Sequence, residues 1–222
     1  MRSEYVACRP RPSILLTGFG AFPGVDTNAT AELVPQLAAE ARRRFPGHEI
    51  LEAVLPVEWL LAPQRLQELV RDASPRLALH FGVSSAATGF QIELVGRNLC
   101  EARHDAAGKL PVTAQLVASG PAILASTLPA EHIVRRLQRA GLPCCTSNDA
   151  GGYLCNALLY HSLTSAHASP EPFLSGFVHL PAGLQTANGA HGEPSACGLS
   201  WRDAIAGGIE IIATCLDMQA AA

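Results

Sequence analysis

Short apolar segments alternate with helix-like segments along almost the whole chain, and this alternation restricts the fold more than any other feature. Segments with strand character lie at residues 13–22, 49–57, 76–84, 90–99, 143–152 (a short strand and its turn) and 173–181. Helical patterns lie at residues 28–44, 59–73 and 129–141, around residue 155, and at residues 200–219. Strand–helix–strand units place neighbouring strands in parallel, with helices on the faces of the sheet. The pattern therefore predicts a three-layer α/β/α fold around a mostly parallel, twisted sheet.

The chain is expected to form a single α/β domain over residues 1–222. Its 222 residues have ordinary globular composition and contain no linker, repeat or low-complexity stretch. Residues 1–12 are charged and interrupted by proline, so we expect a loose N-terminal segment that lacks the apolar core of a signal peptide. No run approaches the roughly 20 apolar residues that cross a bilayer, which predicts that the protein has no membrane partner.

The cysteines and histidines predict neither a disulfide framework nor a metal site. Seven cysteines occur at irregular spacings without a CxxC pair, which is typical of a reducing compartment and predicts a cytoplasmic protein. Cys144 and Cys145 are expected to be buried structural residues of a strand. The histidines form no HExxH motif, and GFGAFPG at residues 18–24 lacks both GxGxxG spacing and a P-loop lysine. We therefore expect no metal and no cofactor.

The charge distribution argues against a nucleic-acid partner. The net charge is −3 and the basic residues are scattered. Their densest cluster, at residues 42–44, lies at the end of a predicted helix, where cations complement the helix dipole.

Four loops rich in small residues follow predicted strands: TGFGAFPG, GVSSAATG, NDAGG and HLPAG. In open α/β sheets the loops beyond the carboxyl ends of the strands hold the ligand, so we expect these loops to converge. Phe19 and Phe22 in the first loop either form the apolar wall of a pocket or pack the core beneath it.

Cys155 lies in the segment SNDAGGYLCN, shortly after Gly151 and Gly152, which permit a sharp turn. Asn148 or Asp149 is expected to cap the helix that follows, so that Cys155 falls in its first turn. Unpaired N–H groups and the helix dipole favour a thiolate at such a position and could also stabilise an oxyanion. Free cysteine is equally a common buried and inert residue, so the position alone permits both interpretations.

His179 and Glu93 are candidates to act together with Cys155. A thiolate mechanism needs an imidazole partner and a group that orients the imidazole. His179 ends the apolar run SGFVHL and should face the same crevice, with a structural role as the alternative. Glu93 is flanked by apolar residues, where a charge needs a partner; a buried ion pair with Arg97 or Arg103 would explain it equally well.

Together these segments resemble one family, the pyroglutamyl peptidases, also called pyrrolidone-carboxylate peptidases, which are cysteine peptidases. ILLTGFGAFPGVDTN resembles the family's N-terminal signature T-G-F-x-P-F-G-G-x-x-x-N, and SNDAGGYLCN resembles its nucleophile motif S-x-x-A-G-x-[FY]-[VL]-C-N. FVHLP matches the histidine segment, and the stretch from Glu93 through Asn98 to Arg103 matches the glutamate segment. The resemblance covers most of residues 13–185, and the nucleophile motif is its most specific part.

The resemblance implies a catalytic triad in which Cys155 is the nucleophile, His179 the general base and acid, and Glu93 the residue that orients the imidazole. It also implies a pocket for the five-membered lactam ring, formed by Phe19, Phe22, Asn28, Arg103, Tyr153 and Leu154. The implied reaction removes an N-terminal pyroglutamyl residue from peptides through a thioester acyl-enzyme. Members of the family occur both as single chains and as assemblies, so a homo-oligomer is compatible with the resemblance.

The chain departs from the family pattern around the expected pocket. Val83 stands where the family commonly has a polar glutamine, and Leu94 stands where it has an arginine. His104 replaces an aliphatic residue, and Asp105–Ala106 replaces a Pro-Asp pair. These changes spare the three chemical groups but leave two alternatives open. One is a related cysteine amidase or hydrolase that acts on another cyclic or small acyl group, and the other is a non-catalytic homologue.

Overall fold

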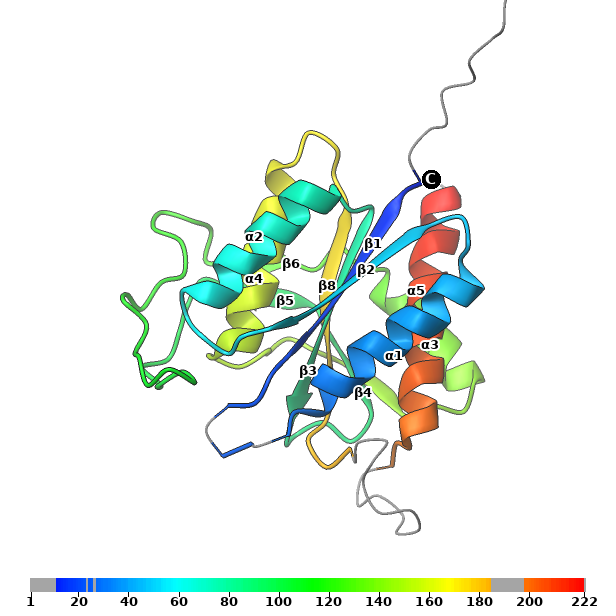
Figure 1. Ribbon diagram of the computed structural model, residues 1–222, viewed down its shortest axis with the longest axis horizontal. Coiled ribbons are helices and arrows are strands. Elements are labelled where there is room, and N and C mark those ends of the chain that lie inside the picture. The colour runs from blue at the N-terminus through cyan, green and yellow to red at the C-terminus, as the bar shows by residue number, and fades with distance from the viewer. Residues whose placement is uncertain (1–10, 23, 26, 185–197, 222) are drawn as a thin grey trace, which may run out of the picture.

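The computed structural model describes residues 11–22, 24–25, 27–184 and 198–221. Helices cover both faces of a six-stranded sheet, which confirms the predicted three-layer α/β/α fold (Figure 1). The strands are β1 (Ser13–Phe19), β2 (Glu49–Leu55), β3 (Leu77–Ser84), β4 (Phe90–Glu93), β5 (Val95–Arg97), β6 (Ile123–Ala125), β7 (Cys144–Ser147) and β8 (Leu174–Pro181). The helices are α1 (Ala29–Arg44), α2 (Leu61–Ala73), α3 (Ala130–Arg139), α4 (Leu154–Ala168) and α5 (Trp201–Ala220). The loose segment expected at residues 1–12 lies almost entirely outside the described residues.

The strand order in the main sheet is β2-β1-β3-β8-β4-β7. The four strands β2, β1, β3 and β8 are parallel, as predicted, whereas β4 pairs antiparallel with β8 and parallel with β7. Only residues 85–89 connect β3 to β4, and a parallel crossover needs about a dozen residues or more, so the chain reverses its direction here. The predicted extended segment at 90–99 divides into β4 and β5, and β5 forms a separate antiparallel pair with β6, a strand that the sequence analysis did not predict.

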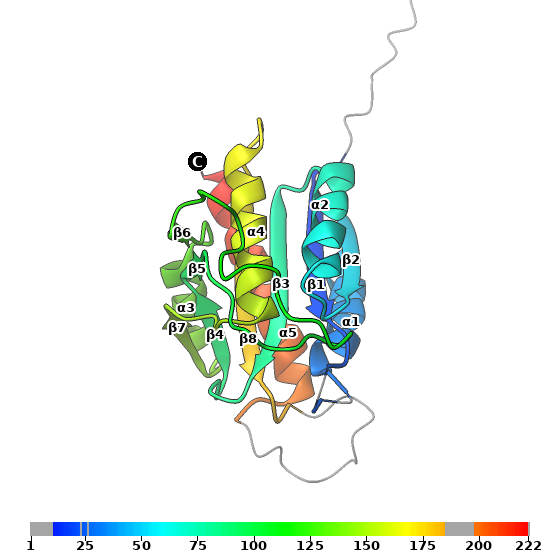
Figure 2. The same ribbon diagram turned by 90° about the vertical axis from the view of Figure 1, so that its left-hand side faces the viewer.

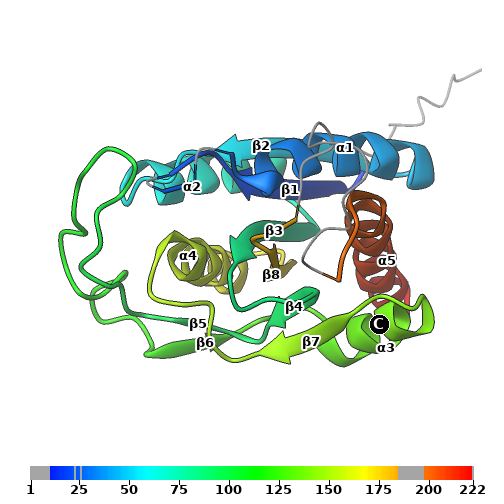
Figure 3. The ribbon, with the colours of Figure 1, turned by 90° about the horizontal axis from the view of Figure 1, so that it is seen from below.

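The helices divide between the two faces of the sheet. Helices α1, α3 and α5 cover one face, while α2 and α4, with the β5–β6 pair, lie on the other (Figures 2 and 3). Strand β1 has an uninterrupted apolar run because both of its faces are covered. Ile14 and Leu16 pack in the core beneath α1 and α5, and Leu15 packs in the core beneath α2 and α4. All three side chains are fully buried. Among the described residues, no helix combines the length and apolarity needed to span a membrane.

A buried series of hydrogen-bonded side chains links four of the elements that carry the site. His80 on β3 is fully buried, and its Nδ1 lies 2.7 Å from Thr17 Oγ1 on β1. Its Nε2 lies 2.8 Å from Ser162 Oγ on α4, which in turn lies 2.7 Å from Ser175 Oγ on β8. Complete burial lowers the pKa of His80 to about 3, so the folded protein holds this imidazole in its neutral form.

This neutral imidazole predicts that acid weakens the fold. An imidazole with a folded-state pKa of about 3 and an unfolded-state pKa of about 6.5 stabilises the fold above pH 6.5. As the pH falls below 6.5, that contribution decreases by about 1.4 kcal/mol per unit. We expect urea unfolding to give a smaller pH 7-to-pH 5 loss in the free energy of unfolding for His80→Gln than for the unaltered chain. The exposed His132→Gln serves as control, and equal losses in all three proteins would contradict the prediction.

Candidate active site

The four predicted loops converge on one cavity of about 430 Å³. Phe22 follows β1, Val83 lies near the end of β3, Asp149 follows β7 and Ala182 follows β8, and all four line the cavity. Cys155 and His179 line it as well, so the candidate nucleophile and imidazole face the same space.

Cys155 is the second residue of α4, in the predicted first turn. The N-cap is Tyr153, which is extended and provides no side-chain cap for the helix. The prediction that Asn148 or Asp149 caps α4 is therefore wrong. Asp149 Oδ1 instead accepts a hydrogen bond at 3.0 Å from the N–H of Gly151, whose φ of +79° is a left-handed conformation that glycine adopts readily. The carboxylate stabilises the turn before the helix, and the first turn of α4 has no side-chain cap.

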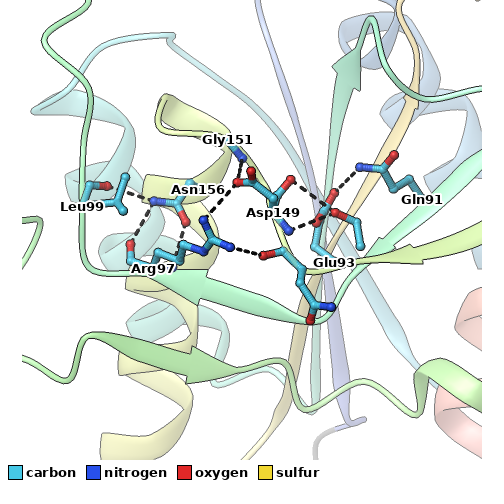
Figure 4. A network of polar contacts seen from close by, with 9 residues as sticks. Gln91, Glu93, Arg97, Leu99, Asp149, Gly151 and Asn156 are labelled. Carbon is cyan, nitrogen blue, oxygen red and sulfur yellow. Dashed lines mark hydrogen bonds and ion pairs between the residues drawn. The ribbon is translucent and has the colours of Figure 1, made fainter.

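Asn156, the residue after Cys155, fixes α4 to the end of β5 (Figure 4). Its Oδ1 accepts a hydrogen bond from the N–H of Arg97 at 2.8 Å, and its Nδ2 donates to the carbonyl oxygens of Arg97 and Leu99, both at 2.9 Å. The side chain is almost fully buried, so these bonds compensate for its desolvation. Cys155 is thus held between a fixed turn and a fixed strand end.

Gly82 on β3 provides the space that the Cys155 sulfur occupies. It pairs in register with His179 on the neighbouring strand β8. A Cβ atom at Gly82 would lie 3.0 Å from Cys155 Sγ and 2.7 Å from the Phe177 ring. The ring of Phe177 packs against the His179 imidazole with a centroid separation of 4.8 Å. The Cys155 sulfur therefore lies over β3 at Gly82, the residue paired with His179 on the neighbouring strand β8.

His179 and Glu93 form a buried pair. His179 is 4% exposed and Glu93 is 0% exposed, and His179 Nδ1 lies 2.8 Å from Glu93 Oε1. Burial alone would lower the pKa of His179, but the charge of a Cys155 thiolate and the hydrogen bond to it, together with the hydrogen bond and charge of Glu93, raise that pKa to about 10. Burial opposes ionisation of Glu93, yet the hydrogen bonds from His179 and Gln91 help to bring its pKa below its usual range.

The two arginines considered as partners of Glu93 lie elsewhere. Arg97 donates to the Asn148 carbonyl oxygen at 2.9 Å and lies 3.7 Å from Asp149 Oδ1. The guanidinium of Arg103 lies over the ring of Tyr153, with its Cζ 4.5 Å from the ring centroid. Neither accounts for the buried Glu93 carboxylate. Its hydrogen-bond partners are His179 and Gln91, and Ser147 also helps to lower its pKa.

The six residues expected to form the lactam pocket all line the cavity: Phe19, Phe22, Asn28, Arg103, Tyr153 and Leu154. Asn28 has a structural role as well, because its Oδ1 accepts from the N–H of Thr30 at 3.1 Å and so caps α1. Its Nδ2 donates to the carbonyl oxygen of Gly20 at 3.1 Å, so the same amide closes the loop after β1.

A loop that the sequence analysis did not interpret fixes the wall around Tyr153. Asp105 is 1% exposed, and its carboxylate accepts hydrogen bonds from the N–H groups of Trp59, Ala107 and Lys109. Trp59 Nε1 donates to the Arg103 carbonyl oxygen at 2.8 Å. The indole also meets the Tyr153 ring edge to face, with centroids 5.3 Å apart. Asp105 thus has a clear role as the anchor of the loop that carries Arg103.

The departures from the family pattern have different consequences for the cavity. Val83 lines it, as expected from the resemblance to the family pattern. His104 instead contributes its carbonyl oxygen, which accepts a hydrogen bond from Tyr153 Oη at 3.0 Å.

The prediction of buried structural cysteines in β7 is wrong for Cys145, which is exposed, whereas Cys144 is half-buried. Strand β7 lies at the sheet edge, where one side of a strand remains open.

Replacing Gly82 with alanine should damage the site directly. The new methyl group would force the Cys155 sulfur and the Phe177 ring to move, at a stability cost of about 1–3 kcal/mol. A displaced nucleophile can lower the rate by about 100-fold. Thermal unfolding and hydrolysis rates check this, with Gly47→Ala as control because a Cβ there meets no atom within 4 Å. Similar activity in the two variants would contradict the placement of the sulfur.

The described residues contain no group of three or more His, Cys, Asp or Glu side chains arranged to hold a metal ion. The thiol of Cys155 and the imidazole of His179 line the cavity, and the carboxylate of Glu93 lies next to that imidazole.

Comparison with known proteins assigns the chain to a family. The family model for pyroglutamyl peptidase matches residues 12–215. The pyrrolidone-carboxylate peptidase of Vibrio vulnificus is 35% identical over 207 residues, covering 93% of each chain. A solved structure of a mutant pyrrolidone carboxyl peptidase from Pyrococcus furiosus is similar with a TM-score of 0.82 at 27% identity, covering 93% of this chain and 99% of that one. Pyroglutamyl peptidase I of Bacillus amyloliquefaciens gives a TM-score of 0.80 at 27% identity, covering 93% and 97%. The chain belongs to the pyroglutamyl peptidase family of cysteine peptidases.

Proposed function

We propose that this protein is an omega-peptidase that hydrolyses the amide bond after an N-terminal pyroglutamyl residue of peptides, with Cys155, His179 and Glu93 as its triad. The observation that carries the proposal is the buried His179–Glu93 pair, 2.8 Å between Nδ1 and Oε1, beside Cys155 at one apolar cavity. The five described cysteines are free thiols, which suits a thiolate enzyme in the cytoplasm.

In the proposed reaction the Cys155 thiolate attacks the pyroglutamyl carbonyl carbon. The first-turn N–H groups of α4 have no side-chain cap, so they are available to bind the oxyanion of the tetrahedral intermediate. The His179 imidazolium donates its proton to the leaving amine, which yields a thioester on Cys155 and a shortened peptide. The neutral imidazole then takes a proton from water as the water attacks the thioester, and the thiolate is released.

The electrostatics of His179 suit both steps. The charge on Cys155 is the largest influence that raises the pKa of His179. Acylation removes that charge, so the imidazolium becomes more acidic at the stage when it must release its proton to the amine. Glu93 keeps the imidazole oriented during both steps, because its Oε1 accepts from Nδ1 throughout.

The cavity suits a neutral cyclic acyl group. Aromatic and aliphatic side chains such as Phe19, Phe22 and Leu154 form much of its lining. Asp149, a carboxylate among its lining residues, is paired with Arg97 and accepts a bond from the Gly151 N–H. An acyl group with a free α-ammonium would lose hydration without gaining a strong partner, whereas an uncharged lactam would lose little.

Hydrolysis of a pyroglutamyl-amide reporter, compared with prolyl, glutaminyl and other small acyl amides, tests the proposal. We expect the kcat/KM for the pyroglutamyl reporter to exceed that for each other amide by at least about 100-fold. Among these acyl groups only the uncharged lactam suits both the apolar side chains and the polar amide side chains that line the cavity. Hydrolysis of the other amides alone would contradict the pyroglutamyl assignment.

Val83 motivates one alternative, a related cysteine amidase with a different small acyl substrate. Its apolar side chain lines the cavity where the family commonly has glutamine, so one polar contact to the acyl group is replaced. The same reporter panel separates this alternative from the main proposal. A non-catalytic homologue is a weaker alternative, because a buried carboxylate–imidazole pair costs desolvation that a purely structural site would not need.

A further inference from the structure

Gln91 lies at the centre of the site and has no role in the family pattern described above. It is on β4 two residues before Glu93, and side chains two apart on a strand point to the same face of the sheet. Across the antiparallel β4–β8 pair it stands directly opposite His179. Its side chain also lines the cavity that contains Cys155.

The Gln91 amide and the His179 imidazole converge on one oxygen atom. Gln91 Nε2 donates to Glu93 Oε1 at 2.8 Å, and His179 Nδ1 lies at the same distance from that atom (Figure 4 shows the Gln91 contact). The other oxygen, Glu93 Oε2, is buried and has no partner at hydrogen-bond geometry among the described residues. The two donors on Oε1 orient the carboxylate about its terminal bond. Ser147, which is paired with Glu93 on the neighbouring strand β7, also helps to lower the pKa of this carboxyl.

We propose that Gln91 is a positioning residue for the reaction: its amide fixes the Glu93 carboxylate toward His179 and favours the ionised form of that carboxylate. The inference rests on the proposed triad and adds a fourth side chain to it. Hydrogen bonds to charged groups are stronger than neutral ones, so a single amide is sufficient to matter.

The ionisable groups that face this amide come from several elements. Cys155 lies on α4 and His179 on β8. Arg103 and Asp149 also line the cavity, and Asp149 is paired with Arg97 at 3.7 Å. The positive end of the Gln91 amide dipole points at Glu93 within this set, and its hydrogen bond helps to lower the pKa of that carboxyl. Removal of the dipole makes the local potential more negative, so formation of the Cys155 thiolate requires a higher pH.

The pH dependence of Cys155 alkylation by iodoacetamide tests this inference without any peptide substrate. Mass spectrometry of the peptide that contains Cys155 separates its labelling from that of the other cysteines. Gln91→Met keeps the length of the side chain and removes the donor, and we expect the alkylation midpoint to rise by about 0.5–1 pH unit. Gln91→Lys keeps a donor and adds positive charge, and we expect the midpoint to fall below that of the unaltered protein.

Turnover of the pyroglutamyl reporter supplies the second measurement. Gln91→Met should lower kcat about tenfold with little change in KM, because the orientation of the imidazole is lost while the acyl pocket is intact. Gln91→Lys should recover part of that loss. Gln138→Met on the exposed surface of α3 is the matched control and should leave the alkylation midpoint and kcat unchanged.

Opposite shifts of the alkylation midpoint in the two variants support the inference, since a merely structural disturbance would not reverse sign with charge. Midpoints equal to that of the unaltered protein in both folded variants, verified by circular dichroism, would overturn it. If Gln91→Met does not fold, the downward shift in Gln91→Lys decides. Opposite shifts in a protein that does not hydrolyse the pyroglutamyl reporter would contradict the proposed function and leave the role of Gln91 intact.

Discussion

Cys155→Ala is expected to reduce kcat/KM for a pyroglutamyl-amide reporter by at least about 10⁴-fold, because the proposed reaction has no nucleophile without this sulfur. The fold should be retained. Cys155 is only partly buried, and a thiol-to-methyl change at such a position costs at most about 1 kcal/mol of unfolding free energy. Steady-state hydrolysis assays measure kcat/KM, and thermal unfolding measures the change in stability.

Cys145→Ala is the matched control for this variant. It makes the same chemical change at an exposed cysteine on the edge strand β7. We expect turnover close to that of the unaltered protein. Near-full activity in Cys155→Ala, or equal losses in the two variants, would contradict the assignment of Cys155 as nucleophile.

Glu93→Gln is expected to have the second-largest effect, with kcat about 10²- to 10⁴-fold lower. The amide preserves the size of the side chain but removes the charge that helps to raise the pKa of His179 to about 10. With that charge absent, the imidazole loses its proton at a lower pH, so the alkaline limb of the activity profile should move down. Nitrogen NMR of His179 reports the same shift as a lower titration midpoint.

Glu131→Gln provides the control for this change, because Glu131 is an exposed residue of α3. It should leave both the rate and the alkaline limb unchanged. A Glu93→Gln protein whose His179 titrates as in the unaltered chain would show that the carboxylate does not govern the imidazole.

The sequence predicted those parts of the fold that depend on local pattern. The strand character of residues 13–22 and the helices expected on both faces of the sheet agree with β1, whose side chains pack into both cores. The helical pattern at residues 28–44 agrees with the bounds of α1, Ala29–Arg44. The reversed direction of β4 and β7 depends instead on tertiary pairing, of β4 with β8 and of β7 with β4, which no local pattern encodes. Strand β6 is only three residues long, too short to show a periodicity.

The candidate site was predicted in its chemical groups but not in their supports. Cys155, His179 and Glu93 stood out because a thiol at a helix start, an imidazole at a strand end and an isolated acid each require an explanation. Asp149 is of a residue type that often caps helices. Here its carboxylate instead accepts a hydrogen bond from the N–H of Gly151 in an Asx-type turn. The position of Gln91 could have been predicted from the sequence. It lies two residues before Glu93 in a segment with strand character, and residues two apart on a strand point to the same face.

The central claim is that acyl transfer passes through a thioester on Cys155. Acid-quenching the enzyme during turnover of a pyroglutamyl ester or amide, followed by peptide mass spectrometry, tests it most directly. We predict that the peptide containing Cys155 gains the mass of one pyroglutamyl group, that hydroxylamine removes it, and that His179→Ala prevents its formation. Rapid turnover with no adduct on Cys155, or with the adduct on another residue, would contradict the account.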